Sequence, residues 1–127
     1  MSAIEGFRGE YRFLSNFFRL SDPIVEIYED KDSGKMIPVK FHTMEHAYQA
    51  SKYQSLDRVL EVASCDSPGG AKRKGRLYVA RPDWETIKLD VMLYFARKKF
   101  QMSYFKERLL ATGDQVLYEV NNHGDVF

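Results

Sequence analysis

The segment from residue 43 to residue 52 constrains the fold most, because its pattern predicts a short helix with two different sides. Thr43 is a typical N-cap for such a helix. Within a helix that begins after this cap, polar and charged groups recur on one face at i, i+3, i+4 and i+7, counted from Glu45, at Glu45, Tyr48, Gln49 and Lys52. Small or apolar groups suited to packing fill another face, at Met44, Ala47, Ala50 and Ser51. We therefore expect one side of this helix to pack and the other to present polar groups to a ligand.

Strand signals precede this helix, and most helix signals follow it. Strands are expected at residues 6–13, 24–28, 36–41 and 115–120, the middle two forming a hairpin around a polar turn. Pro38 indicates an edge strand or a bulge. Further helices are expected at residues 57–63, 68–78, 84–100 and 103–110, with a buried stripe formed by Trp84, Ile87, Val91, Phe95 and Lys98. This order predicts an α+β fold, a small and mostly antiparallel sheet with several packed helices, in one domain over residues 1–127.

Length and composition narrow the class of protein. The 127 residues can bury a core without a disulfide, and the single cysteine, Cys65, has no intrachain partner. We find no run long and apolar enough for a bilayer and no secretory or transit signal, so we expect a cytoplasmic protein without a membrane partner. The net charge of +1 is unlike that of a dedicated nucleic-acid binder, although basic clusters at 72–76 and 97–99 leave a nucleic-acid substrate open.

The pattern H-x-x-E-H runs from His42 to His46 and is typical of inverted zinc proteases. Zinc binding would need both imidazoles on one helical face, with Glu45 as the base. His42 instead ends the second hairpin strand, before the helix, so the ligand geometry fails. His123 and Asp125 are the candidates for a third ligand. A zinc hydrolase is thus an outside alternative, and we expect His46 to be a satisfied, partly buried histidine.

Each remaining candidate has a plain structural alternative. Glu45 and Lys52 also fit a solvated ion pair on the surface, which contributes little to stability. Trp84 fits a core anchor as well as one wall of a slot for a ring. Lys72 and Arg76 fit a solvated face, but they follow a Pro-Gly-Gly helix start, where free N–H groups and cations favour a phosphate.

An ordered series of short motifs resembles the NADAR, or YbiA-like, family over nearly the whole chain. The series comprises Phe13-Leu14-Ser15-Asn16-Phe17, Glu45-His46-Ala47-Tyr48-Gln49-Ala50, Lys52, Ser67-Pro68, Ala71-Lys72, Gly75-Arg76, Trp84, Val91-Met92, Lys99-Phe100, Leu109-Leu110-Ala111-Thr112-Gly113-Asp114, Leu117, Glu119 and Asp125. Members are small α+β proteins linked to NAD and ADP-ribose metabolism. The resemblance implies cleavage of a bond between ribose C1′ and nitrogen, with no obligatory metal and no cofactor. Because members usually continue beyond the matching Asp125, we expect this chain to lack the family's C-terminal segment.

The resemblance implies a role for each candidate residue. Glu45 would stabilise an oxocarbenium-like ribose and position water, with Asp125 as the second acid. Lys52 would act either as a cation toward phosphate or leaving group, or as an amine that attacks C1′ of the ring-opened sugar. The substrate-binding residues would be Trp84 with Phe17, Phe18 or Tyr48 for stacking on the base, Asn16 and Gln49 for hydrogen bonds, and Lys72 and Arg76 for phosphates. The resemblance implies as partner a small nucleotide, such as a phosphoribosylamino-pyrimidine of riboflavin synthesis, or an ADP-ribosylated base such as guanine, with ADP-ribosylated nucleic acid left open. The alternative function is a non-catalytic module that binds ADP-ribose or NAD.

Overall fold

The computed structural model describes residues 3–5, 9–113 and 116–118. In chain order the elements are β1 (Ala3–Glu5), the 3-10 helix η1 (Gly9–Leu14), β2 (Ile24–Glu29), β3 (Met36–Phe41), α1 (Met44–Ala50), α2 (Leu56–Ala63), α3 (Pro68–Lys74), α4 (Trp84–Gln101), α5 (Ser103–Ala111) and β4 (Val116–Tyr118). The predicted α+β class is confirmed. One small sheet is the antiparallel pair β2–β3, and the other is the parallel pair β1–β4. None of the helices in the described ranges has the length and apolar character that a bilayer crossing needs.

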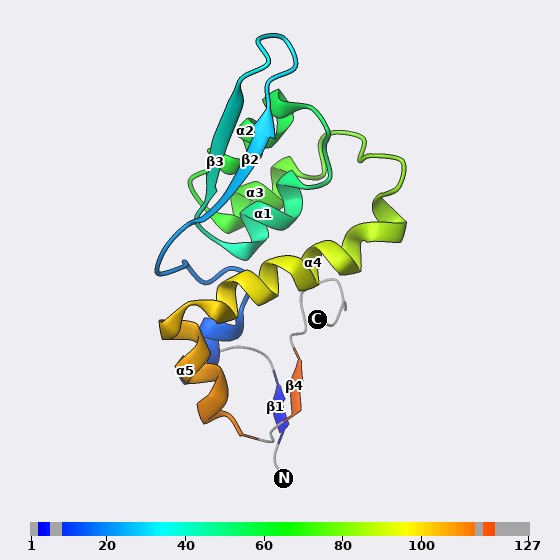
Figure 1. Cartoon of the computed structure of the whole chain (residues 1–127). Helices are drawn as coiled ribbons and strands as arrows, with labels where there is room; N and C mark the ends of the chain where they lie inside the picture. Colours follow the sequence, from blue (N-terminus) through cyan, green and yellow to red (C-terminus); the bar gives the residue numbers. More distant parts are fainter. Residues whose placement is uncertain (1–2, 6–8, 114–115, 119–127) are drawn as a thin grey trace.

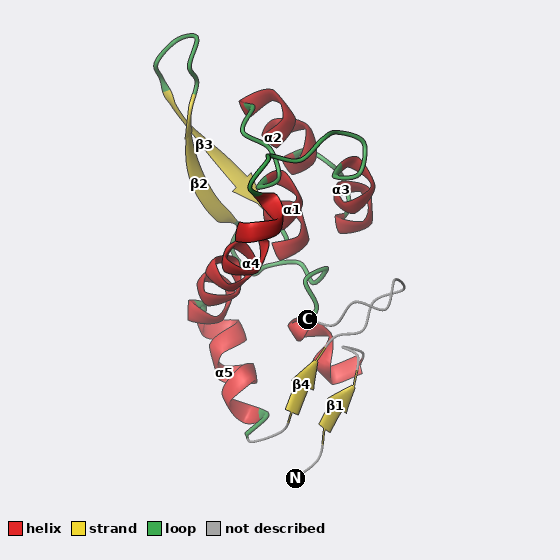
Figure 2. Ribbon diagram, turned by 90° about the vertical axis from the view of Figure 1, so that its right-hand side faces the viewer, coloured by secondary structure: helices red, strands yellow, loops and turns green. Residues whose placement is uncertain are grey.

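Helix α4 runs across the middle of the molecule and separates two groups of elements (Figure 1). The hairpin β2–β3 and helices α1, α2 and α3 lie on one side, while η1, α5 and the β1–β4 pair lie on the other (Figures 1 and 2). Helix α1 is central to the first group, since it contacts α2, α3, α4 and β3. The rings of Phe41 and Phe95 meet edge to face at 6.3 Å and join the hairpin to α4.

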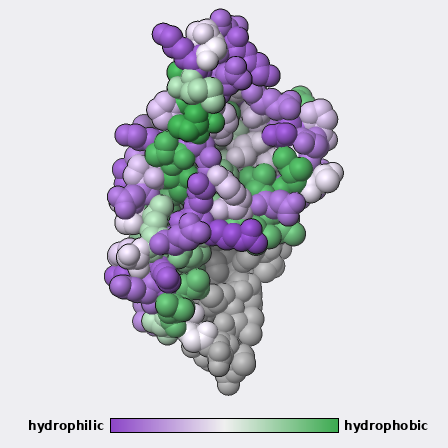
Figure 3. Space-filling view, in the orientation of Figure 1, coloured by the Kyte–Doolittle hydropathy of each residue, from purple (hydrophilic) through white to green (hydrophobic). Residues whose placement is uncertain are grey.

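The hairpin forms where its sequence predicts it. Its turn is closed by Asp30, whose carboxylate accepts hydrogen bonds from the backbone N of Asp32 and the hydroxyl of Ser33, and by Gly34 at φ 72°. Pro38 pairs with Ile27 and is exposed, as expected of an edge strand. Apolar side chains also gather along the outer surface of the hairpin (Figure 3), namely Val25, Ile27 and Met36.

The expected strand at residues 6–13 is wrong for its described part. Residues Gly9–Leu14 form the 3-10 helix η1 instead. The physical reason lies in Phe13 and Leu14, which are adjacent and both buried. Neighbouring residues of a strand point to opposite faces, so a strand could not bury both on one side, whereas a helical turn can.

Two helix predictions need correction. Helix α3 ends at Lys74 rather than near residue 78, because the backbone N of Gly75 closes it on Ala71 O and the chain then turns. In α4, Lys99 rather than Lys98 continues the buried stripe. Lys99 lies one turn beyond the buried Phe95 and is 0% exposed, while Lys98 points toward Glu26 and is half-buried.

Candidate active site

Helix α1 begins at its predicted cap. Thr43 has an extended backbone, and its Oγ1 accepts a hydrogen bond from the backbone N of His46 at 3.1 Å. The expectation of a two-sided helix is wrong, however, because every residue of α1 is buried. The helix also stops at Ala50, where the hydroxyl of Ser51 turns back to Ala47 O at 2.8 Å. Lys52 therefore lies beyond the end of the helix, so it does not continue the helical face formed by Glu45 and Gln49.

Glu45 is a buried carboxylate, only 6% exposed. Its Oε1 accepts a hydrogen bond from Nε2 of Gln49 at 2.8 Å, so the predicted pairing at i, i+4 holds for these two residues. Its backbone N donates to the carbonyl O of Asn16 at 3.0 Å. That bond joins the start of α1 to the turn that contains Asn16 and Phe17. The acid is thus fixed both by its own helix and by the preceding turn.

Lys52 reaches the end of α3. Its Nζ donates to Gly75 O at 3.3 Å, and the hydroxyl of Tyr53 donates to the same oxygen at 3.0 Å. Burial lowers the pKa of Lys52, and Arg76 and Lys72 lower it further, while Glu45 and Glu85 act in the opposite direction. Lys52 thus lies next to Arg76 through its bond to Gly75 O, and Glu45 and Lys72 are close enough to influence its charge.

Gly75 is a residue that sequence reasoning used only as part of a motif. A Cβ at this position would lie 2.1 Å from Oε1 of Gln49 and 2.9 Å from its Cδ. Only glycine therefore lets α3 approach the side chain that holds Glu45. The Gly-Arg pair after a basic helix was the available signal, but nothing in it names Gln49 as the neighbour.

The cations of α3 lie toward its end. The ammonium of Lys72 is 5.9 Å from the ring centroid of Phe17, whose side chain is exposed. Arg76 is exposed just beyond the helix. At the helix start, the backbone N of Gly70 donates to Oγ of Ser67 at 3.0 Å, so the cap side chain already uses that N–H group. Because one N–H group of the first turn is already bonded, we expect an anion to bind at the side chains of Lys72 and Arg76 rather than at the start of the helix.

The aromatic candidates divide into packed and accessible rings. Tyr48 and Trp84 are both buried and pack on each other, with centroids 5.0 Å apart. Phe18 lies against α5, stacked on Tyr104 at 6.4 Å and edge to face with Phe105 at 5.9 Å. Phe17 is the exposed ring of the set. Two further candidates, Asp125 and His123, lie outside the described residues.

His46 is a satisfied, buried histidine, as expected. Its Nε2 lies 2.8 Å from Cys65 O, and a carbonyl can only accept, so Nε2 carries the proton. Its Nδ1 then accepts from the hydroxyl of Thr43 at 2.8 Å. Burial lowers the pKa of His46, which keeps this neutral form. His42 lies off the helix, as expected, and among the described residues, which do not include His123 and Asp125, there is no group of three metal-binding side chains.

Lys99 is the second residue that sequence reasoning used only as part of a motif. This fully buried lysine donates from Nζ to Ser15 O at 3.0 Å and lies 5.0 Å from the ring of Phe105. It thereby fixes the turn whose next residue, Asn16, bonds the backbone of Glu45. The available signal was its spacing of four from Phe95 on the stripe of α4.

Several known proteins are similar to this chain in sequence. A riboflavin biosynthesis protein of Vibrio vulnificus is 34% identical over 118 residues, 91% of this chain and 29% of that protein. A chloroplastic riboflavin biosynthesis protein of Zea mays is 36% identical over 98 residues, 67% of this chain and 16% of that protein. The chain thus spans less than a third of the length of either. The N-glycosidase YbiA of Escherichia coli is 33% identical over 112 residues, 82% of this chain and 68% of that protein.

The fold of E. coli YbiA is also similar. Its NMR structure matches with a TM-score of 0.71 at 30% identity, covering 97% of this chain and 74% of that one. The family model described as the NADAR domain matches residues 6–127, nearly the whole chain. The resemblance seen in the ordered motifs is therefore confirmed, and this chain belongs to the NADAR domain family.

Proposed function

We propose that this protein hydrolyses the N-glycosidic bond between C1′ of a ribose and a nitrogen of its base. The observation that carries the proposal is the buried carboxylate of Glu45 in the same charged region as Lys52, Lys72 and Arg76. An acid that is held in place and adjoins an amine and two cations suits a substrate that develops positive charge at a sugar while it carries phosphates. The similarity to proteins named N-glycosidase and riboflavin biosynthesis protein supports this reaction class.

Glu45 would stabilise the cationic sugar. Breaking the C1′–N bond builds oxocarbenium character on the ribose, and a carboxylate beside C1′ stabilises that charge. The hydrogen bond from Gln49 holds the carboxylate, and the backbone bond to Asn16 holds the helix start that carries it, so that little reorganisation is needed during the reaction. Asp125 is our proposal for the second acid, which would activate or orient water on the other side of the sugar.

Lys52 has two routes open to it. In the cation route its ammonium holds a phosphate or assists the departing base. In the amine route the neutral amine attacks C1′ of the ring-opened sugar, the base leaves with a proton, and the resulting Schiff base is hydrolysed by water to the free sugar and the amine. The lowered pKa of Lys52 supports the amine route, because it raises the neutral fraction at a given pH.

The substrate class follows from the rest of the region. The exposed ring of Phe17 would stack on the base, beside the ammonium of Lys72. Lys72 and Arg76 would bind the phosphates. A phosphoribosylamino-pyrimidine, as in riboflavin synthesis, and an ADP-ribosylated guanine both fit this description, and an ADP-ribosylated nucleic acid would present the same groups.

The main test is Glu45→Gln, assayed by mass spectrometry for release of free base from these two substrate classes. We expect a loss of about a hundredfold or more in turnover, since general acid–base and electrostatic groups contribute at that scale. Glu29→Gln, an exposed carboxylate on the hairpin, is the matched control and should leave turnover unchanged. Unchanged turnover in Glu45→Gln would refute the assigned role. Substrate binding without any base release by the unaltered protein would favour the non-catalytic module instead.

A second experiment separates the two routes of Lys52. Lys52→Arg retains a cation but has no nucleophilic amine, so it should preserve turnover in the cation route and abolish it in the amine route. Reduction with borohydride during turnover should also trap the sugar on the peptide that contains Lys52 in the amine route. Full activity of Lys52→Arg together with no trapped adduct would remove the Schiff base from the mechanism.

A further inference from the structure

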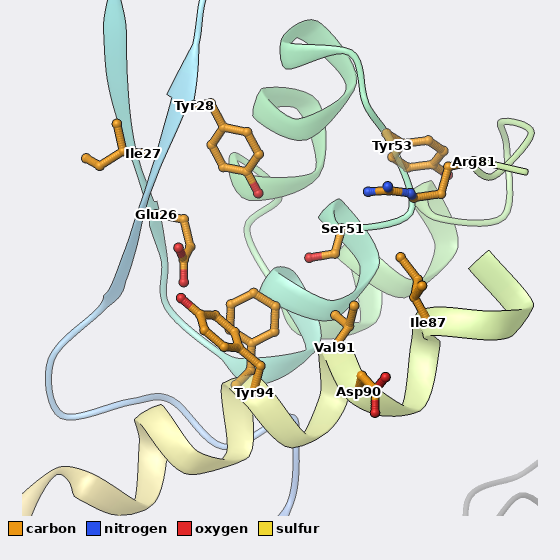
Figure 4. A pocket seen from close by; sticks show the side chains of 11 residues that line it. Glu26, Ile27, Tyr28, Ser51, Tyr53, Arg81, Ile87, Asp90, Val91 and Tyr94 are labelled. Carbon is orange, nitrogen blue, oxygen red and sulfur yellow. The ribbon is translucent and has the colours of Figure 1, made fainter. Parts of the chain in front are cut away.

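A separate pocket of 430 Å³ lies between the hairpin and α4 (Figure 4). Glu45, Lys52 and Lys72 do not line it. Its apolar wall comes from α4, at Ile87, Val91 and Phe95, and the rings of Tyr28, Tyr53 and Tyr94 complete much of the lining. Ser51 and Tyr53 flank Lys52 in the chain, so the pocket adjoins the backbone of the candidate site without sharing these side chains.

Glu26 supplies the charge of this pocket. Its carboxylate points from β2 toward the hydroxyl end of Tyr94 (Figure 4). Oε1 of Glu26 is shielded from solvent and finds no hydrogen-bond partner among the described residues. A buried carboxylate oxygen without a donor is costly, so this atom favours any group that can bring an N–H to it.

The side chain of Lys98 indicates which donor fits. Its ammonium lies 3.8 Å from Oε1 of Glu26, too far for a hydrogen bond, and 5.0 Å from the ring centroid of Tyr94. The Lys98 side chain is 39% exposed and can move into solvent. Tyr94 and Glu26 raise the pKa of Lys98, so its ammonium between a carboxylate and a tyrosine face is an internal substitute for a bound organic cation. Burial, Glu26 and Tyr94 also raise the pKa of Tyr28 to about 12, as a site that disfavours further negative charge would do.

The other charges around the pocket agree with a cationic ligand. Arg81 is the one cation in the lining, and both oxygens of Asp83 hold its guanidinium, at 2.5 and 3.1 Å. Asp90 adds a second carboxylate to the lining. With the charge of Arg81 already paired, the remaining formal charge of the lining is negative.

We propose that this pocket binds a small organic cation, an ammonium or amidinium group on a compact apolar body. The cationic group replaces Lys98 beside Glu26 and lies against the ring of Tyr94. The apolar body rests on Ile87 and Val91. A neutral alcohol of the same shape gains a weaker hydrogen bond to Glu26 and no cationic contact with the tyrosine face, and an anion is repelled by the carboxylate.

The test is an NMR titration of the full chain with cyclohexylmethylammonium, and with cyclohexylmethanol and cyclohexanecarboxylate as matched neutral and anionic probes. We expect the ammonium to bind at least about tenfold more tightly than either probe and to shift the amide signals of residues 26–28 and 87–95. Equal binding of the alcohol, absence of binding, or shifts confined to other residues would each overturn the proposal.

Three variants sharpen this test. Lys98→Ala removes the internal competitor from an accessible position, so it should tighten ammonium binding severalfold. Glu26→Gln should weaken it by about tenfold or more, since it removes the charged acceptor. Glu29→Gln lies on the outward face of the same strand and should leave binding unchanged. Weaker binding by Lys98→Ala would contradict the proposal that the ligand takes the place of the Lys98 ammonium. Equal losses of affinity in Glu26→Gln and Glu29→Gln would show only a general effect of charge and would overturn the assignment of Glu26.

Discussion

Replacing Gly75 with alanine should disturb the candidate site through packing alone. The backbone of Gly75 has φ −66° and ψ −6°, a conformation that alanine adopts without strain. The added Cβ, however, would lie 2.1 Å from Oε1 of Gln49 and 3.2 Å from its Cβ. Either Gln49 leaves Glu45, or α3 moves away from α1 and takes Gly75 O away from Lys52. Both responses alter the groups that we propose to act on the substrate.

The size of the effect follows from three contributions. Alanine in place of glycine at a compatible backbone position adds about 0.4–1 kcal/mol of stability by restricting the unfolded chain. An extra methyl group in a filled site costs about 1–3 kcal/mol. If Gln49 instead swings away, the clash is relieved but its bond to the Glu45 carboxylate is lost, at a cost of about 1.5–3 kcal/mol. Because one cost or the other applies, we expect Gly75→Ala to lower the free energy of unfolding by about 0.5–3 kcal/mol.

Urea unfolding of Gly75→Ala and of Gly69→Ala tests this reasoning. Gly69 is in the same helix, but its Cβ would meet nothing closer than Nη1 of Arg73 at 3.5 Å, so that variant should be neutral or slightly stabilised. The double variant Gly75→Ala with Gln49→Ala should recover the part of the loss caused by the clash with the amide. If Gly75→Ala proves as stable and as active as Gly69→Ala, the close contact between α3 and Gln49 does not limit the fold or the site.

Three further predictions concern Lys99, Lys52 and His46. Lys99→Met should lower kcat/KM for base release, because the turn at Ser15 loses its anchor, whereas Lys98→Met at the adjacent accessible position should not; equal kinetics in both variants would contradict this. The pKa of Lys52 in the folded state is lowered from 10.5, so the unfolded chain binds more protons than the folded chain in the pH window just below 10.5. Stability to urea should therefore rise with pH in that window, and the rise should be absent from Lys52→Met. In the amine route, base release should rise through the same window, and a fall would assign the cation role. The pKa of His46 is lowered from 6.5, so stability should decline as pH falls below 6.5, and His46→Gln should show a shallower decline in urea midpoints.

Local chemistry explains which elements could be predicted from the sequence. The hairpin turn at Asp30 and Gly34, the cap at Thr43 and the Ser-Pro start of α3 each depend on residues that lie close together in the chain, and the structure has all of them where expected. The strand prediction at residues 6–13 is wrong in its described part because the alternation of aromatic and polar residues indicates a strand. The burial of Phe13 together with Leu14 depends instead on helix α5, which contacts η1 but is distant in the sequence.

The environment of α1 could not be predicted in the same way. Periodicity placed Glu45 and Gln49 together, but it cannot say how many neighbours a helix has. Contacts with α2, α3, α4 and β3 bury every side of α1, so its polar face meets protein rather than solvent. Lys99 and Gly75 could not be predicted for the same reason, because each acts on a partner that is distant in sequence. Lys99 donates to Ser15 O, and Gly75 leaves room for the side chain of Gln49.

Hydrogen-bond satisfaction separates scaffold from candidate chemistry along this buried helix. His46 uses both ring nitrogens on Thr43 and Cys65, keeps a neutral ring, and so has no remaining atom with which to act. Lys52 is the contrasting case. It donates one 3.3 Å hydrogen bond to a carbonyl, and its pKa is lowered by burial and by nearby cations against the opposing effect of nearby carboxylates. Buried polar groups that are fully satisfied specify a fold, whereas a weakly held amine beside a fixed carboxylate is available to a substrate. The H-x-x-E-H pattern groups Glu45 and His46 in one zinc site. In this fold His46 instead stabilises the structure, whereas Glu45 belongs to the candidate active site.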